Sequence, residues 1–381
     1  MNLLTHSAMS CYKSCPRRYY YAYIKTIRKE RTSDPLRIGS AVHIGLDLLA
    51  QGKSTDDVCN AVRDQYADPP QWTLAEPDGQ FEWDVECETV VRLLLGYAWR
   101  WGNDEFTTID TEMEFNVPLL NPDTGRPSRT FRHAGKIDKR GKTADGRNAI
   151  REHKTTGDDI SPDSDYWTRL RMDQQIGGYW LASIATGFVP DTIEYDVIRK
   201  PGIEPKLMPL TDTEGRKIVL DDDGRRAFKS NGEPYESSNA AKGLKLQQRR
   251  ETPEEFGERL AADLAERPDF YFARHEIPRI ESDIEDFRNE LWQIAQQIGE
   301  ATHKGRWYRN TDACLRPYKC EFFGPCSNGT YLLTEVPSGY IQLGTPHPEL
   351  TGGQHNASSQ TTRIAAATKP AAQGEPVAVT A

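Results

Sequence analysis

The sequence has no apolar run long enough to cross a membrane. Its longest apolar stretches, near residues 90–95 and 180–185, fall well short of the roughly 18 residues that a spanning helix needs. The N-terminus also lacks the basic-then-apolar pattern of a secretory signal. We therefore expect a cytoplasmic protein with no membrane partner.

The sequence also lacks an excess of positive charge. It has 48 Lys and Arg residues against 57 Asp and Glu residues, a net charge of −9, so it does not coat nucleic acid by bulk charge. A local basic groove remains compatible with this total. No Walker motif, zinc finger or helix-turn-helix pattern is found, and neither a nucleotide cofactor nor sequence-specific DNA readout is expected. The 37% of hydrophobic residues suffice for the core of one large domain or two ordinary ones.

Helical and strand patterns succeed one another along the chain and predict an α/β fold. Helices are predicted from Ser7, after Gly39, and over residues 85–101, 166–187, 253–266 and 281–302. Strands are predicted over residues 109–117, 131–140, 148–155 and 192–200. The centre of the chain should therefore be a β-rich hairpin flanked by helices.

Composition predicts one folded domain over residues 1–336. Its parts are a helical region (1–105), a catalytic core (106–200), a polar insertion (201–250), and C-terminal helices with a cysteine loop (251–336). The insertion is Gly-rich and without clear periodicity, so we expect an insertion or mobile arm. No internal repeat is seen along the chain. Residues 337–381 have few large apolar groups and are expected to form a disordered tail.

The strongest local signal is a pair of carboxylates on a predicted hairpin. Asp145-Gly146 marks the turn, and residues equidistant from it should face each other, which pairs Asp138 with Glu152. Lys154 shares the face of Glu152. Such a site favours Mg²⁺ or Mn²⁺, which activates water for attack on a phosphodiester. On spacing alone, a surface hairpin with a Glu/Lys ladder is the more frequent explanation.

Asp138 and the run Glu152-His153-Lys154 resemble the core of the PD-(D/E)xK nuclease superfamily, in its RecB-type exonuclease branch. Further motifs of that branch have counterparts here in the same order, over residues 1 to about 330: Cys15-Pro-Arg-Arg-Tyr19, Gly39-Ser-Ala-Val-His43, Gln175-Ile-Gly-Gly-Tyr179, and the late cysteines Cys314, Cys320 and Cys326. The resemblance implies a restriction-endonuclease-like core, in which helices flank a central mixed sheet. An N-terminal helical segment and a C-terminal cysteine-cluster loop would complete it.

The resemblance also implies roles for single residues. His43, Asp138, Glu152 and the backbone carbonyl of His153 would bind the Mg²⁺ or Mn²⁺ ion, and Lys154 would be the catalytic lysine. Gln175 and Tyr179 lie on one helical face and would support the site and the DNA strand. Two alternatives stay open: Gln174 in place of Gln175, and Glu112 or Glu114 as an outer acidic group.

The cysteines suggest a second metal site. In a reducing compartment, clustered cysteines among the seven present favour metal ligation over disulfides. By resemblance, a four-iron four-sulfur (4Fe-4S) cluster would be held by Cys15, Cys314, Cys320 and Cys326. The five residues between Cys314 and Cys320 exceed the two usual in the family, so a structural Zn²⁺ ion and unligated cysteines remain alternatives. Cys11 is a substitute ligand, and Cys59 and Cys87 are expected in the core.

A basic aromatic segment near the N-terminus is the predicted DNA contact. Between Lys13 and Arg37, eight basic residues and two acidic ones give a local charge of +6. Arg17, Arg18, Tyr19 and Tyr20 are expected to meet phosphates and bases. A solvated amphipathic helix explains the same composition equally well.

Together these features predict a metal-dependent DNA nuclease. We expect an exonuclease acting on single strands or duplex ends in phage recombination or replication, with a helicase or recombination protein as partner and the host cytoplasm as its location. A CRISPR-adaptation-type nuclease, or a catalytically silent module of the same fold that binds DNA or a partner, is the alternative.

Overall fold

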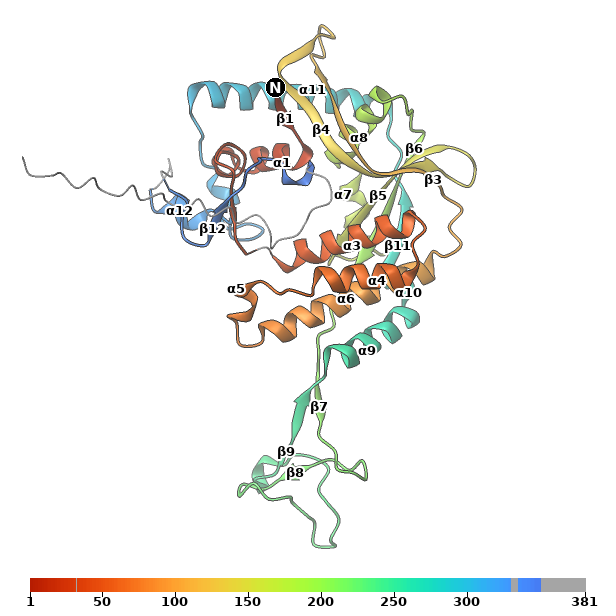
Figure 1. Ribbon diagram of the computed structural model, residues 1–381, viewed down its shortest axis with the longest axis vertical. Helices are drawn as coiled ribbons and strands as arrows, with labels where there is room; N and C mark the ends of the chain where they lie inside the picture. Colours follow the sequence, from red (N-terminus) through yellow and green to blue (C-terminus); the bar gives the residue numbers. More distant parts are fainter. Residues whose placement is uncertain (32, 330–334, 351–381) are drawn as a thin grey trace, which may run out of the picture.

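The computed structural model describes residues 1–31, 33–329 and 335–350, and its centre is a six-stranded mixed sheet (Figure 1). The strands are ordered β1 (Asn2–Leu4), β4 (Pro127–Lys142), β5 (Asn148–Thr156), β6 (Thr192–Arg199) and β11 (Phe272–Glu276), and β3 (Thr107–Leu120) also pairs with β4. β1 is parallel to β4 and β5 is parallel to β6, whereas the other pairs are antiparallel. The predicted α/β fold with a mixed sheet is confirmed.

The β4–β5 hairpin has the register expected from its turn. Lys142 faces Asn148 and Lys139 faces Arg151, so each pair is equidistant from the turn that ends at Gly146. Gly146 has a φ of +85°, a conformation that favours glycine. The last pair of the ladder is Lys139 with Arg151. Asp138 and Glu152 therefore lie just beyond the ladder, where the strands begin to separate.

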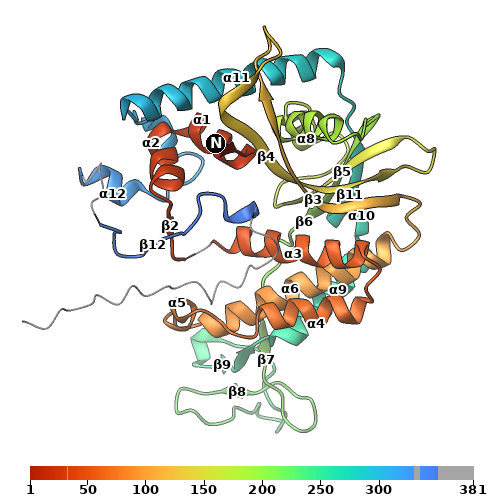
Figure 2. The same ribbon diagram turned by 45° about the horizontal axis from the view of Figure 1, so that its top comes forward.

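Helices lie on both sides of the sheet (Figures 1 and 2). One layer contains α3 (Asp34–Ala50), α4 (Thr55–Gln65), α6 (Gly79–Arg100) and α9 (Pro253–Glu266), which share a core with the first residue of β11. The other side carries α1 (His6–Ser14), α7 (Asp165–Leu170), α8 (Gln174–Ala185) and α11 (Glu281–Lys304). No helix within the described parts of the chain combines the length and apolar character that a bilayer crossing requires.

The helix expected over residues 166–187 is in fact two helices, α7 and α8. The chain turns at residues 171–173, and the Asp173 side chain caps α8 by accepting a hydrogen bond from the Gln175 amide at 2.9 Å. An Asp side chain that satisfies a free amide in this way begins a new helix. The break lets α8 approach the sheet and places Gln175 in its first turn.

Short elements link the N-terminal segment to the C-terminal part of the chain. They are α2 (Pro16–Tyr19), the π-helix η1 (Tyr20–Ile24), β2 (Ile27–Lys29), α12 (Phe323–Ser327), β12 (Tyr340–Gln342), and the 3-10 helices η3 (Thr311–Ala313) and η4 (Pro348–Leu350). α5 (Gln71–Leu74) and α10 (Pro268–Tyr271) extend the helical layer.

β12 pairs antiparallel with β2, and the Leu343 amide donates to the Thr26 carbonyl at 2.8 Å. The expectation of a disordered tail therefore does not hold for residues 337–350, because backbone pairing needs few apolar side chains. Residues 351–381 lie outside the described residues.

The insertion projects from the body as an arm with a repeated turn (Figure 1). Its strands are β7 (Leu207–Pro209), β8 (Val219–Leu220), β9 (Lys245–Leu246) and β10 (Gln248–Arg250), with the 3-10 helix η2 (Ala240–Lys242) between β8 and β9. Tight turns begin at Asp212, Asp221 and Lys229, and in each the first amide donates to the carbonyl four residues later. Each turn contains a glycine at positive φ. The turns at Asp212 and Asp221 also share the residues Asp-x-x-Gly-Arg, and in both the Asp Oδ1 accepts a hydrogen bond from the Arg amide. The expectation of no internal repeat along the chain therefore misses this short repeat in the arm.

Candidate active site

Asp138 and Glu152 lie together where β4 and β5 separate. Their exposed fractions are 9% and 2%, so both carboxyl groups are largely removed from water. The His153 amide donates a hydrogen bond to Asp138 Oδ2 at 2.9 Å. The His153 ring points to the other face, with Nδ1 3.6 Å from Asp196 Oδ2. The hairpin therefore presents two carboxyls and the backbone of His153 on one side.

A group suited to a metal ion forms around Asp138. Ligand atoms of His43 on α3, Glu112 on β3 and Asp138 all lie within 4.8 Å of one another. The His43 Nδ1 and Asp138 Oδ2 atoms are 3.6 Å apart. Glu152 is outside this trio, yet its buried Oε2 has no hydrogen-bond partner among the described residues. An imidazole and three carboxylates, one with a free buried oxygen, fit the donor set of Mg²⁺ or Mn²⁺.

Glu112 enters this group through an unusual backbone conformation. It has a φ of +50°, which is strained for a residue with a side chain. It lies between the pairs Thr111–Lys139 and Met113–Ile137, so it faces Asp138 across the β3–β4 ladder. Lys136 forms an ion pair with it. The sequence offered Glu112 only as an outer group, because strand alternation does not reveal a left-handed residue.

The two buried carboxyls resist ionisation without a cation. Burial, with the nearby charge of Glu112, raises the pKa of Asp138 to about 7. Burial, with the charge of Asp138, raises the pKa of Glu152 to about 8. Like charges in a dry site disfavour each other's charged form. A bound divalent cation would remove this cost, which again fits a metal site.

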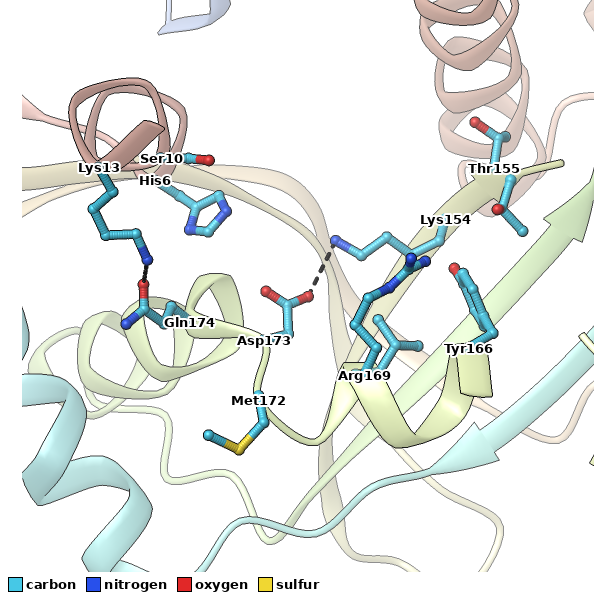
Figure 3. Close-up of a pocket in the computed structure, with 12 residues that line it drawn as sticks. His6, Ser10, Lys13, Lys154, Thr155, Tyr166, Arg169, Met172, Asp173 and Gln174 are labelled. Carbon is cyan, nitrogen blue, oxygen red and sulfur yellow. Dashed lines mark hydrogen bonds and ion pairs between the residues drawn. The ribbon is translucent and has the colours of Figure 1, made fainter. Parts of the chain in front are cut away.

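Lys154 joins the carboxyls to α8. Its Nζ donates to Glu152 Oε1 at 2.9 Å and to Gln175 Oε1 at 2.6 Å. It also lies 3.4 Å from Asp173 Oδ2 (Figure 3). Although burial opposes its charge, Glu152 and Asp173 hold the pKa of Lys154 above its ordinary value. The sequence analysis did not identify Asp173 as a site residue. The available indication was that Asp is a common N-cap residue, which Asp173 is for α8.

Gln175 and Tyr179 form a second contact behind Lys154. The Gln175 amide nitrogen donates to the Tyr179 hydroxyl at 2.7 Å. Tyr179 is only 6% exposed, so it holds Gln175 from within the core. Gln174, the alternative candidate, instead contacts Lys13 and Glu290. The structure thus places Gln175 at the site and Gln174 beside it.

The four cysteines expected to hold a cluster do not form a metal site in the structure, although Cys15 and Cys314 both contact Asn310. The Asn310 amide donates to Cys15 Sγ at 3.4 Å, and Cys314 Sγ donates to the Asn310 carbonyl at 3.7 Å. Among the described residues, no three cysteine sulfurs lie within 4.8 Å of one another. Burial raises the pKa of the Cys320 thiol.

The structure therefore gives no support to the predicted 4Fe-4S cluster or to the Zn²⁺ alternative. Cys314, Cys320 and Cys326 stand in a loop whose backbone is closed by hydrogen bonds, such as that from the Cys320 amide to the Cys314 carbonyl at 2.8 Å. Cys11 is packed against the N-terminal core, where burial raises its pKa to about 12. Cys59 is buried as expected, and Cys87 packs against the core of the helical layer.

The predicted DNA contacts at the N-terminus serve the core instead. Tyr19 and Tyr20 are 5% and 8% exposed, and each ring centroid lies 5.7 Å from that of Trp307. Arg17 Nε donates to the Trp307 carbonyl at 2.9 Å, and Arg18 pairs with Glu321 at 3.0 Å. Both rings are packed into the core and are not presented to a base in this structure, so the DNA contact of the two tyrosines stays a prediction. The aromatic run resembles a surface in the sequence because its partner, Trp307, is remote along the chain.

Comparison with known proteins supports the assignment of the fold. The sequence model of the PD-(D/E)XK nuclease superfamily matches residues 3–326. No curated protein matches the chain. A solved structure, "Crystal structure of SSO0001", is 16% identical with a TM-score of 0.18, and the match covers 36% of this chain and 61% of that one. This chain thus spans about 61% of the length of that protein. A similarity this low supports no conclusion about the fold or the function of this chain. The family match covers most of the described chain and the whole of the site, and the chain belongs to the PD-(D/E)XK nuclease superfamily.

Proposed function

We propose that the protein is a metal-dependent DNA exonuclease that hydrolyses phosphodiester bonds at single-stranded or duplex ends. One observation carries the proposal: Asp138, Glu152 and Lys154 meet in a buried site beside His43 and Glu112. A catalytically silent module has no need to retain these groups at a cost in stability, because two buried carboxyls repel each other.

The chain's own residues divide the work of the reaction. His43, Glu112 and Asp138 would hold the Mg²⁺ or Mn²⁺ ion, with Glu152 and the His153 carbonyl as further ligands. When bound, a divalent cation lowers the pKa of water and polarises the phosphodiester. Lys154 is oriented by Gln175 and Asp173, so its ammonium can hydrogen-bond the attacking water or a phosphate oxygen. Tyr179 fixes Gln175 and thereby the lysine.

The proposed biological setting is DNA end processing in phage recombination or replication, alongside a helicase or recombination protein. The projecting arm extends well beyond the body that carries the site, so it offers a surface for such a partner (Figure 1). A CRISPR-adaptation-type nuclease shares the same catalytic arrangement, and no feature of the described residues favours it.

End-labelled linear DNA, single-stranded and duplex, and circular DNA test the proposal with Mg²⁺ or Mn²⁺. Linear DNA should be degraded and circles left intact. Glu152→Gln and Lys154→Ala should each slow cleavage about 100-fold or more, because they remove groups that act on the reacting phosphate. Glu214→Gln is the matched control, since this carboxylate is 66% exposed on the arm. Undiminished cleavage by both variants would refute the site, and cleavage of circles would refute the exonuclease assignment.

A further inference from the structure

A cavity of about 800 Å³ opens beside the catalytic lysine (Figure 3). Lys154, Thr155 and Thr156 of β5 line one side of it. One wall is α1, with His6, Ser10 and Lys13, and the other is α7 and the turn before α8, with Arg169 and Asp173. The volume falls within the range of sites that bind small ligands or parts of larger ones. Lys154 faces both this cavity and the carboxyl pair, so the two spaces adjoin.

Cationic groups outnumber anionic ones in the cavity. Lys13, Lys154 and Arg169 line it, and Asp173 is the acidic residue among its lining residues. Lys154 is already paired with Glu152 and Asp173, which leaves Lys13 and Arg169 for a ligand. Lys13 Nζ contacts the neutral Gln174 amide. Arg169 pairs with Asp158, but the two side chains are 65% and 55% exposed, so water and salt weaken this pair. The cavity therefore suits an anionic ligand.

Uncharged groups in the cavity offer a ligand a hydrogen bond and an apolar contact. His6 Nδ1 is buried and has no hydrogen-bond partner among the described residues, although buried polar atoms are normally satisfied. Burial lowers the pKa of His6 to about 4, so the ring is neutral near pH 7 and offers a hydrogen bond. At the rim, Met172 is 83% exposed and gives an apolar surface. Cations, an unsatisfied polar atom and an apolar rim together match a nucleotide, which has a phosphate, a sugar and a base.

We propose that this cavity, the Lys13 pocket, binds the nucleotides of the DNA strand next to the phosphodiester that is cleaved. Lys13 and Arg169 contact backbone phosphates, and His6 hydrogen-bonds the strand. The proposal rests on the proposed nuclease function, because it takes DNA as the ligand. It adds a strand-binding site on the Lys154 side of the carboxyl pair.

A binding titration tests the pocket separately from catalysis. The probe is a short fluorescein-labelled single-stranded oligonucleotide, followed by fluorescence anisotropy in EDTA at several salt concentrations. Lys13→Ala combined with Arg169→Ala should weaken binding about tenfold. The slope of log affinity against log salt should become shallower by about 0.7 for each phosphate that the variant no longer neutralises. In steady-state cleavage, KM should rise while kcat changes little.

A second variant reaches the pocket without removing charge. Ser10 is exposed at the pocket wall, so Ser10→Trp should occupy the cavity while leaving the melting temperature unchanged. It should also weaken oligonucleotide binding. Lys242→Ala on the arm is the control and should bind like the wild type, since this lysine is exposed and far from the pocket.

The results distinguish the pocket from the nuclease assignment. If the wild type cleaves DNA, and both the double variant and Ser10→Trp bind with unaltered affinity and salt slope, the pocket is overturned and the active site stands. If the wild type binds the oligonucleotide through Lys13 and Arg169 but cleaves nothing with either metal, the pocket is supported and the nuclease function is overturned.

Discussion

Asp138 makes stability depend on pH when no cation is bound. Its folded pKa of about 7 lies above the unfolded value of 3.8, so ionising this carboxyl costs stability. The cost is absent below about pH 4, grows as the pH rises, and is complete above about pH 7. Asp138→Asn removes it. In EDTA at pH 8 the variant should be more stable by about 1–3 kcal/mol, with the difference vanishing toward pH 4.

Thermal unfolding followed by circular dichroism at pH 4 to 8 measures this effect. Mn²⁺ provides the control, since it should raise the melting temperature of the wild type and have little effect on Asp138→Asn. Wild type and variant melting alike at every pH in EDTA would contradict the assignment of Asp138 as a buried, unneutralised carboxyl.

Gln175 should act on the reaction only through Lys154. Gln175→Ala removes the 2.6 Å acceptor of the lysine and the partner of Tyr179, so the ammonium loses its fixed position. We expect kcat to fall about 10- to 100-fold, as is usual for groups that orient a catalytic residue. KM and melting temperature should change little. Gln297→Ala on the exposed side of α11 is the control, and equal kcat values for the two variants would refute the role.

At the residue scale, sequence spacing predicts which side chains share a face of the β4–β5 hairpin, and it predicts little else about the site. Asp138, Glu152 and Lys154 follow from the turn, because strand geometry fixes which side chains share a face. Glu112 depends on a positive φ that no local pattern reveals. Tyr19 is buried by Trp307, a contact between residues too distant in sequence for periodicity to show.

Helix α8 owes its position to two glycines that weaken it locally. A Cβ on Gly177 would lie 2.5 Å from Phe287 Cγ, and one on Gly178 would lie 2.6 Å from His133 Nε2. The close approach of α8 to α11 and β4 thus requires residues without side chains. Gly177→Ala should destabilise the protein by about 1–3 kcal/mol, because overpacking outweighs the gain in helix propensity.

Gly299→Ala is a matched control for Gly177→Ala. Gly299 also lies within a helix. A Cβ added there would have Phe131 Cε2 as its nearest neighbour, at an ordinary contact distance of 3.5 Å. This variant should be as stable as the wild type, or more stable by up to about 1 kcal/mol. Urea unfolding measures both, and a stabilised Gly177→Ala protein would show that α8 does not pack as described.

The pairing of β12 with β2 should contribute measurable stability. Tyr340 is hydrogen-bonded to the Glu321 carbonyl, and His347 is 7% exposed. A chain ending at residue 337 should therefore melt several degrees below one ending at 350. Because neither chain contains residues 351–381, the comparison isolates residues 338–350. Identical melting curves would mean that β12 contributes no stability.

At the element scale, local signals predict elements better than their ends or partners. The β4–β5 register follows from Asp145-Gly146, and α9 begins at a capping box in which Thr252 and Glu255 bond reciprocally. The α7–α8 break depends on Asp173, one polar residue within an otherwise helical pattern. β12 is three residues long, so only its partner β2 defines it.

Over the whole molecule, part of the charge of the N-terminal segment is neutralised by ion pairs within the protein. Arg18 pairs with Glu321, Arg31 with Glu76, and Arg37 with the buried Glu86. These pairs reduce the local charge of +6, whereas Lys13 of the same segment lines the pocket. Attraction of DNA must be local, near groups such as Lys13 and Arg169, which agrees with a chain of net charge −9.

The body should fold and cleave short DNA independently of the arm. Val219, Ala227 and Leu244 form their own small core, and the base is closed by β7 pairing with β10 and by buried Glu251, which accepts from the Lys206 amide at 3.1 Å. Replacing residues 210–247 by an Asn-Gly turn keeps this base, since Pro209 faces Gln248.

The body should lose less than about 1 kcal/mol of stability, because substitutions outside its core leave its packing intact. Cleavage of short oligonucleotides, which reach only the site and the Lys13 pocket, should keep its wild-type rate. If cleavage of short oligonucleotides fails while the melting temperature holds, the arm must act at the active site; if only long DNA is cleaved more slowly, the arm binds substrate or a partner away from it.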